Sequence, residues 1–150
     1  MGVVMFYHLT ASGMEETARA LLTRSLQAGW RVMLRGTDAA GLERLDQILW
    51  QGPAESFLPH GLAGGPHDAQ QPILLGTGAI ANGAKALMAV EGAEVSLDEA
   101  RGLERVFILF NGHDDVAVAA ARVQWKTLTG AGLAAQYWSE ENGSWEKKAG

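Results

Sequence analysis

A basic–aromatic–basic group of side chains lies near the end of the sequence. Arg122, Trp125 and Lys126 are three and four residues apart, so they share one face if the segment is helical. Two cations beside an indole suit an acidic peptide, especially one that ends in a hydrophobic residue with a free carboxylate. A solvated basic patch, in which the cations offset the helix dipole near its C-terminus, explains the same residues. The spacing leaves both interpretations open.

Two large aromatic residues lie on either side of Pro53. Trp50 follows an amphipathic stretch, and Phe57 lies between Pro53 and Pro59. Aromatic side chains beside prolines often act as anchors at protein interfaces. Alternatively, both rings close the core beneath a loop. We therefore expect Trp50 and Phe57 to be either contact residues or core residues.

Catalytic and metal-binding motifs are incomplete in this sequence. The loop between Gly76 and Gly83 satisfies part of a phosphate-loop motif and part of a GxGxxA dinucleotide pattern, but Ala84 replaces the required lysine. The four histidines lack metal-ligand spacing, no serine lies in a GxSxG motif, and cysteine is absent. We expect a noncatalytic protein without cofactor or metal. A nucleotide-binding α/β enzyme that uses this glycine loop is the alternative.

Length and charge restrict the class of protein. The chain has 150 residues, of which 47% are hydrophobic, so we expect one folded domain over residues 1–150. A net charge of −5 argues against direct binding to nucleic acid. The apolar runs are far shorter than the ~20 residues of a membrane span, and the first residues lack the pattern of a signal peptide. We expect a cytoplasmic protein with no membrane contact.

The order of the predicted elements indicates an α/β fold. Strands are predicted at residues 2–7, 30–34, 73–75, 86–90, 106–110 and 133–138. Helices are predicted from a capping box at Ser12 and Glu15 to Gly29, over residues 39–50, and from Asp114 or Asp115 to Gly130 or Gly132. This order favours parallel strands joined by right-handed crossovers. We expect a single three-layer α/β domain, with a mostly parallel or mixed sheet and helices on both faces.

Two further segments complete the expected domain. All four prolines fall within residues 51–72, together with several glycines, so a long loop is expected there. In the helix over residues 39–50, Leu42, Leu45, Ile48 and Leu49 are expected to face the core, and Glu43, Arg44 and Asp46 to face solvent. A C-terminal extension is expected over about residues 139–150.

The segment LDQILWQGPAESFLPHGLAGGP, residues 45–66, resembles the chi subunit family of bacterial DNA polymerase III. FYHL near the start, and RVQWK followed by GAG near the end, extend the resemblance over most of the chain. It implies a noncatalytic α/β accessory subunit of the clamp-loader complex. Such a subunit bridges the replicase to single-stranded DNA-binding protein by binding that protein's acidic, Phe-ending C-terminal tail.

The resemblance also implies roles for individual residues. Arg122, Trp125 and Lys126 match the family's triplet for the tail, although Val118 stands where a further basic residue can occur. A second set matches the surface that contacts the psi subunit, for which a helicase-like partner competes: Trp50 and Phe57, with Pro59 and His60 in the same motif. The extension, with Trp145, Lys147 and Lys148, is expected to add contacts.

Overall fold

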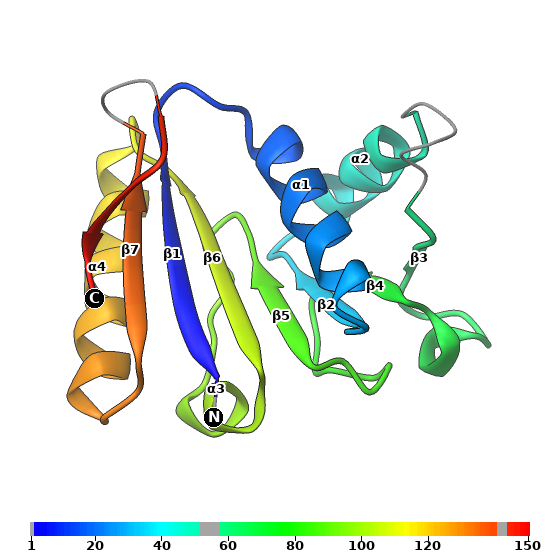
Figure 1. Cartoon of the computed structure of the whole chain (residues 1–150). Coiled ribbons are helices and arrows are strands. Elements are labelled where there is room, and N and C mark those ends of the chain that lie inside the picture. Colours follow the sequence, from blue (N-terminus) through cyan, green and yellow to red (C-terminus); the bar gives the residue numbers. More distant parts are fainter. Residues whose placement is uncertain (1, 52–57, 141–143) are drawn as a thin grey trace.

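The computed structural model describes residues 2–51, 58–140 and 144–150. Within these ranges, eight strands form one sheet in the order β3-β4-β2-β5-β6-β1-β7-β8 (Figure 1). The strands are β1 (Val3–Leu9), β2 (Val32–Arg35), β3 (Gly61–Leu62), β4 (Ile73–Gly76), β5 (Ala86–Ala89), β6 (Arg105–Asn111), β7 (Ala135–Ser139) and β8 (Glu146–Ala149). Every neighbouring pair is parallel except β7 and β8, which are antiparallel. The predicted mostly parallel or mixed sheet is confirmed.

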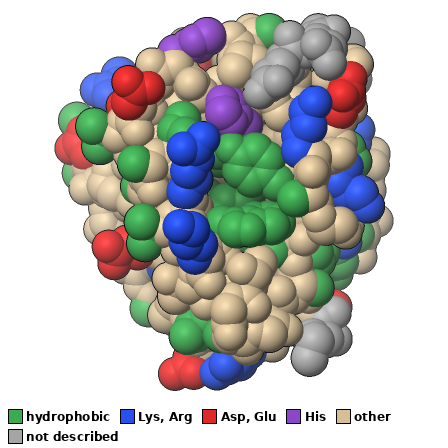
Figure 2. Space-filling model, turned by 90° about the vertical axis from the view of Figure 1, so that its left-hand side faces the viewer, with side chains coloured by type: hydrophobic (Ala, Val, Ile, Leu, Met, Phe, Trp, Pro, Cys, Tyr) green, Lys and Arg blue, Asp and Glu red, His purple; other side chains and the backbone are tan. Residues whose placement is uncertain are grey.

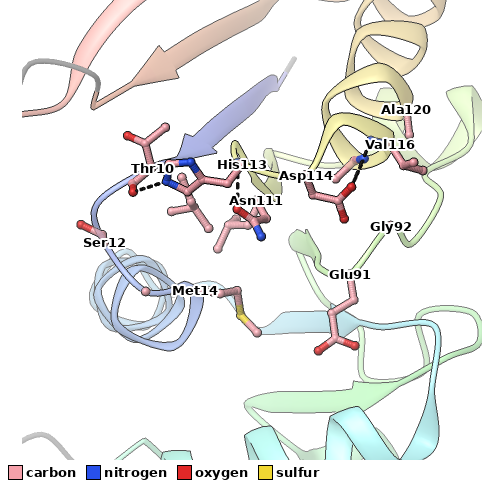
Figure 3. Close-up of a pocket in the computed structure, with 14 residues that line it drawn as sticks. Thr10, Ser12, Met14, Glu91, Gly92, Asn111, His113, Asp114, Val116 and Ala120 are labelled. Atoms are coloured by element: carbon pink, nitrogen blue, oxygen red, sulfur yellow. Dashed lines mark hydrogen bonds between the residues drawn. The ribbon is translucent and has the colours of Figure 1, made fainter.

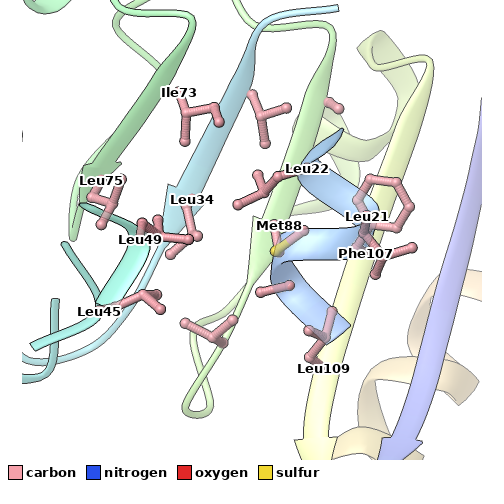
Figure 4. Packing of buried hydrophobic residues seen from close by; sticks show 14 of the residues in the cluster. Leu21, Leu22, Leu34, Leu45, Leu49, Ile73, Leu75, Met88, Phe107 and Leu109 are labelled. Atoms are coloured by element: carbon pink, nitrogen blue, oxygen red, sulfur yellow. The ribbon is translucent and has the colours of Figure 1, made fainter. Parts of the chain in front are cut away.

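Helices cover both faces of this sheet. The helices α1 (Met14–Gln27) and α2 (Ala39–Trp50) pack on one face, and α3 (Leu97–Gly102) and α4 (Asp115–Gly130) pack on the other. Figure 4 shows Leu22 of α1 and Leu49 of α2 close to Leu34 and Met88 of the strands. The predicted three-layer α/β architecture is therefore confirmed. Among the described residues, no helix combines the length and apolarity that crossing a bilayer requires.

Side-chain caps explain where α2 and α4 begin, but the start of α1 differs from the prediction. The Asp38 carboxylate accepts hydrogen bonds from the backbone at the start of α2, and Asp114 does so at the start of α4, as expected for N-caps. The predicted capping box of Ser12 and Glu15 is wrong. The N-cap of α1 is Gly13, which has no side-chain cap, because the Ser12 hydroxyl donates to the Glu140 carboxylate instead.

Three short elements of the described chain were not predicted. The prediction of a loop throughout residues 51–72 is only partly correct, because β3 pairs with β4 and a 3₁₀ helix, η2 (Asp68–Gln70), follows it. The helix α3 was not predicted, although Ser96 and Glu99 form a capping box at its start. The C-terminal extension contains β8, which closes one edge of the sheet against β7.

Candidate peptide-binding site

The basic–aromatic–basic triplet lies on one face of α4, as its spacing predicts. Because this segment is a continuous helix, residues three and four apart are surface neighbours. Arg122 and Lys126 are exposed, and Trp125 is half-buried between them and the sheet. Neither cation forms an ion pair within the part of the chain that the structure describes. Both charges are therefore available to an acidic ligand.

Aromatic rings from three elements form a floor beside these cations. The Trp125 ring meets Phe6 of β1 edge-to-face at a centroid distance of 5.3 Å, and it meets Tyr137 of β7 in the same way at 5.9 Å. The Tyr137 ring is stacked on Phe6 at 6.4 Å. Figure 2 shows hydrophobic side chains beside basic ones on the side of the molecule that carries α4, β7 and β8. The tryptophan is thus held by packing rather than displayed on a mobile side chain.

His8 supports the floor from β1. Its Nδ1 lies 2.7 Å from the Tyr137 hydroxyl oxygen, and its ring packs against Phe110 at 5.2 Å and Tyr137 at 5.9 Å. Local sequence patterns did not predict His8, Phe6 or Tyr137 as site residues. Strand alternation places positions 6 and 8 of β1 on one face, but only the pairing of β1 with β7 brings Tyr137 beside them.

The extension adds a cation on the same side of the sheet. Ser139 pairs with Glu146, so Glu146 shares the face of Ser139 and Tyr137. The Lys148 ammonium forms an ion pair with Glu146, with its nitrogen 3.2 Å from Glu146 Oε2. A register shift next to Tyr137 leaves Lys148 as an extra residue between the partners of Tyr137 and Trp138. Lys148 therefore lies on the face of the aromatic floor.

The second predicted site surrounds the end of α2. Trp50 is 48% exposed, and its ring centroid lies 4.4 Å from that of His60. His60 is buried, with Nδ1 2.5 Å from the Leu58 carbonyl oxygen and Nε2 3.2 Å from Asp46 Oδ1. The prediction that Asp46 faces solvent is wrong, because this contact draws it inward.

The predicted residues of the second site differ in exposure. Among the described ones, Trp50 is exposed, Pro59 is half-buried, and His60 is buried against the Trp50 ring. Phe57 lies outside the described residues.

A cavity of about 680 Å³ lies at the carboxyl ends of β1 and β6, between the first turns of α1 and α4 (Figure 3). The helices that follow these neighbouring strands cover opposite faces, so this is the switch point where α/β folds bind nucleotides. Glu91 and Asp114 line the cavity, and its described lining contains neither lysine nor arginine. A phosphate would find neither a lysine nor an arginine side chain among these described lining residues.

An internal carboxylate occupies the amide groups that a phosphate would need. The backbone nitrogens of Thr10, Ala11 and Ser12 donate to Glu140 Oε1 at 2.9, 2.9 and 2.7 Å. Although burial raises the pKa of Glu140, these hydrogen bonds and that from the Ser12 hydroxyl bring it below its ordinary value. Successive backbone amides of this kind bind anions. In this protein the bound anion is the Glu140 carboxylate, which belongs to the chain itself.

The glycine loop after β4 also lacks the features of a nucleotide site. Residues 76–86 lead from β4 into β5, and no helix lies between the two strands. A dinucleotide fingerprint needs a helix N-terminus against the pyrophosphate. The structure therefore does not support the nucleotide-binding alternative.

Comparison with known proteins agrees with the resemblance. The family described as "DNA polymerase III chi subunit, HolC" matches residues 1–136. The DNA polymerase III subunit chi of Escherichia coli K12 is 41% identical over 53 residues, which are 35% of this chain and 36% of that protein. The protein of the same name from Pseudomonas aeruginosa is 36% identical over 63 residues, 42% of this chain and 43% of that protein. The aligned segments thus span less than half of each relative.

Proposed function

The chain belongs to the DNA polymerase III chi subunit family, and we propose that it works as a noncatalytic adaptor of the replicase. One surface binds the acidic C-terminal tail of single-stranded DNA-binding protein. A second surface binds the clamp-loader complex through the psi subunit or its equivalent. Two weak contacts on one rigid body raise the effective concentration of polymerase on coated template. The protein performs this adaptor role in the cytoplasm, and the role requires no direct contact between the protein and DNA.

The tail-binding role rests on two unpaired cations beside an anchored tryptophan. Acidic side chains and the terminal carboxylate of the tail approach Arg122 and Lys126, which have no competing carboxylate partner among the described residues. The terminal phenylalanine ring packs on the floor of Trp125 and Tyr137. A solvated basic patch alone would not need the aromatic floor.

The clamp-loader role rests on Trp50. A large aromatic side chain that is 48% exposed, with a buried ring packed against it, is typical of an interface anchor. Psi, or a helicase that competes with it, contacts this surface together with Pro59 and Phe57. His60 holds the tryptophan ring in place and is not itself exposed.

A bridging measurement tests the adaptor role. A peptide that copies the tail is immobilised, this chain is captured on it, and the psi subunit of the same replicase is then added. The proposal predicts that psi is retained only when the chain is present. It is contradicted if psi displaces the chain from the tail, because the two surfaces would then overlap.

A further inference from the structure

Among the described residues, no helix lies over β7 and β8 on the face of the sheet on which α1 and α2 pack (Figure 1). A cavity of about 340 Å³ lies there between α1 and the strands β1 and β7. Ligand pockets in proteins have volumes of about 300–1,000 Å³. Its lining includes Met5, Tyr7, Arg24, Trp138 and Trp145. The cavity is therefore large enough for a small ring-bearing group.

Two tryptophans and a tyrosine form its walls. The Trp145 ring, from the C-terminal extension, meets Tyr7 edge-to-face at a centroid distance of 5.2 Å. Trp138 is half-buried, and its indole nitrogen donates to Gln136 Oε1 at 3.1 Å. Aromatic walls in this arrangement accept a planar apolar group at their faces or edges.

The floor of the cavity holds a buried hydroxyl with a poor partner. Tyr7 is 7% exposed, and within the described residues the hydrogen-bond partner of its hydroxyl is the Met5 sulfur, 4.0 Å away. This contact is too long to satisfy a phenol, and buried polar groups are normally satisfied. An acceptor atom on a ligand would supply the missing hydrogen bond.

Two guanidinium groups make this end of the cavity electropositive. Arg24 lines it and forms no ion pair in the part of the chain that the structure describes. Arg105 reaches the Met5 sulfur with Nη1 at 3.0 Å, and its buried Nε has no hydrogen-bond partner. Burial raises the pKa of Tyr7, and Arg24 and Arg105 both oppose that rise, so both charges act at the hydroxyl.

A carboxylate lines the other end of the same cavity. Glu16 lies eight residues before Arg24 on α1, which is about 12 Å along a helix. It disfavours a polyanion that runs the whole length of the cavity. It leaves the Tyr7 end open to a single negative charge.

We propose that this cavity binds an aromatic group that carries one carboxylate, presented by a segment of a partner protein. The ring lies against Trp138 and Trp145, and the carboxylate accepts from the Tyr7 hydroxyl and pairs with Arg24. The cavity is on the opposite face of the sheet from α4, so this site does not depend on the tail-binding proposal. Overall net charge and Glu16 favour a protein segment over a nucleic-acid strand.

Indole signals in nitrogen-15 NMR spectra of the full chain test this site, with 3-phenylpropionate as the probe. The expected result is saturable shifts of the Trp138 and Trp145 signals, while the Trp50 and Trp125 signals stay in place. Phenylpropylamine has the opposite charge and should bind much more weakly. Equal binding of the two compounds, or no shift with the carboxylate, overturns the proposal. A short oligothymidylate that shifts these signals where 3-phenylpropionate does not also overturns it.

Two substitutions localise the probe. Tyr7→Phe removes only the hydroxyl and should weaken binding about threefold to tenfold. Arg24→Gln, at an exposed position where folding is preserved, should weaken it about tenfold or more. Arg44→Gln, on the exposed side of α2, is the matched control and should have no effect. Unchanged affinity in Arg24→Gln contradicts the site even if Tyr7→Phe fails to fold.

Discussion

The carboxylate of Glu140 lies 2.7 Å from the backbone nitrogen of Ser12, across 128 residues of sequence. This contact joins the end of β7 to the loop between β1 and α1. It fills the backbone amide groups that follow β1 and takes the Ser12 hydroxyl away from its predicted role as a helix cap. The contact therefore holds the backbone in place just before α1. It also occupies the amide groups at the position where other α/β proteins bind phosphate.

Glu140→Gln should destabilise the protein at neutral pH. The substitution keeps the size of the side chain but places an amide against donors that need an anion, at a cost of about 1–3 kcal/mol. Urea denaturation at pH 7 measures the loss, with the exposed Glu43→Gln as the control. An unfolding free energy equal to that of the unsubstituted protein would contradict the role assigned to Glu140.

Acid should weaken the fold through Glu99. The side-chain hydrogen bond from Arg35 is the largest cause that lowers the pKa of Glu99, from 4.5 to about 2. Because the folded-state pKa is depressed, the stabilisation is present above pH 4.5 and is lost as the pH falls toward about 2. Arg35→Ala should flatten this part of the curve of unfolding free energy against pH. A curve with the same slope in the variant would show that other carboxyl groups account for acid sensitivity.

The Arg35 substitution should also reduce stability at neutral pH. Its Nε donates to the Gly78 carbonyl oxygen at 3.0 Å, and its Nη1 donates to that of Glu94 at 3.0 Å. These bonds hold the loops after β4 and β5 to the end of β2. Glu99→Gln removes the charge but keeps these two bonds, so it should cost less than Arg35→Ala at pH 7.

Trp50→Ala should abolish binding of psi while leaving the fold and tail binding unchanged. Interface anchors contribute about 2 kcal/mol or more when truncated to alanine. Since Trp50 is half exposed, its loss should have little effect on the melting temperature. Binding of psi is measured by calorimetry, and binding of the tail peptide by anisotropy. A large fall in melting temperature would instead assign Trp50 to the core.

Arg122→Gln and Lys126→Gln should each weaken tail binding and make it less sensitive to salt. One lost charge-assisted contact corresponds to a loss of about tenfold in affinity. Lys148→Gln should have a smaller effect, because Lys148 is already paired with Glu146. Arg44→Gln, with the same charge change on α2, controls for net charge. Equal weakening in Arg44→Gln would indicate that only the overall charge matters.

Local patterns predicted most of the elements, and long-range contacts account for the errors. The apolar spacing of α2 predicted residues 39–50, which are the observed bounds, because one face of this helix packs on the sheet. The prediction that Asp46 faces solvent was wrong because its carboxylate contacts His60, which is distant in the sequence. The cap of α1 was wrong because its competitor, Glu140, lies at the opposite end of the chain.

The proposed tail site was also predicted only in part. The spacing on α4 predicted Arg122, Trp125 and Lys126 as neighbours, since three and four residues are one helical turn. The aromatic floor beneath them depends on Phe6, His8 and Tyr137. Those residues meet only because β1 and β7 are adjacent in the sheet. No local pattern encodes that pairing, so the sequence identified the cations and the tryptophan but not the surface that holds them.

The tail-binding role of the α4 face is tested by titrating the chain with a fluorescent peptide that copies the C-terminus of the single-stranded DNA-binding protein, at two salt concentrations. We expect saturable binding that weakens with salt and is lost when the terminal phenylalanine is removed. We also expect the Trp125 indole signal to shift as the peptide binds. Absence of binding, or binding that does not depend on the terminal phenylalanine, would contradict the assignment of the α4 face as the tail site.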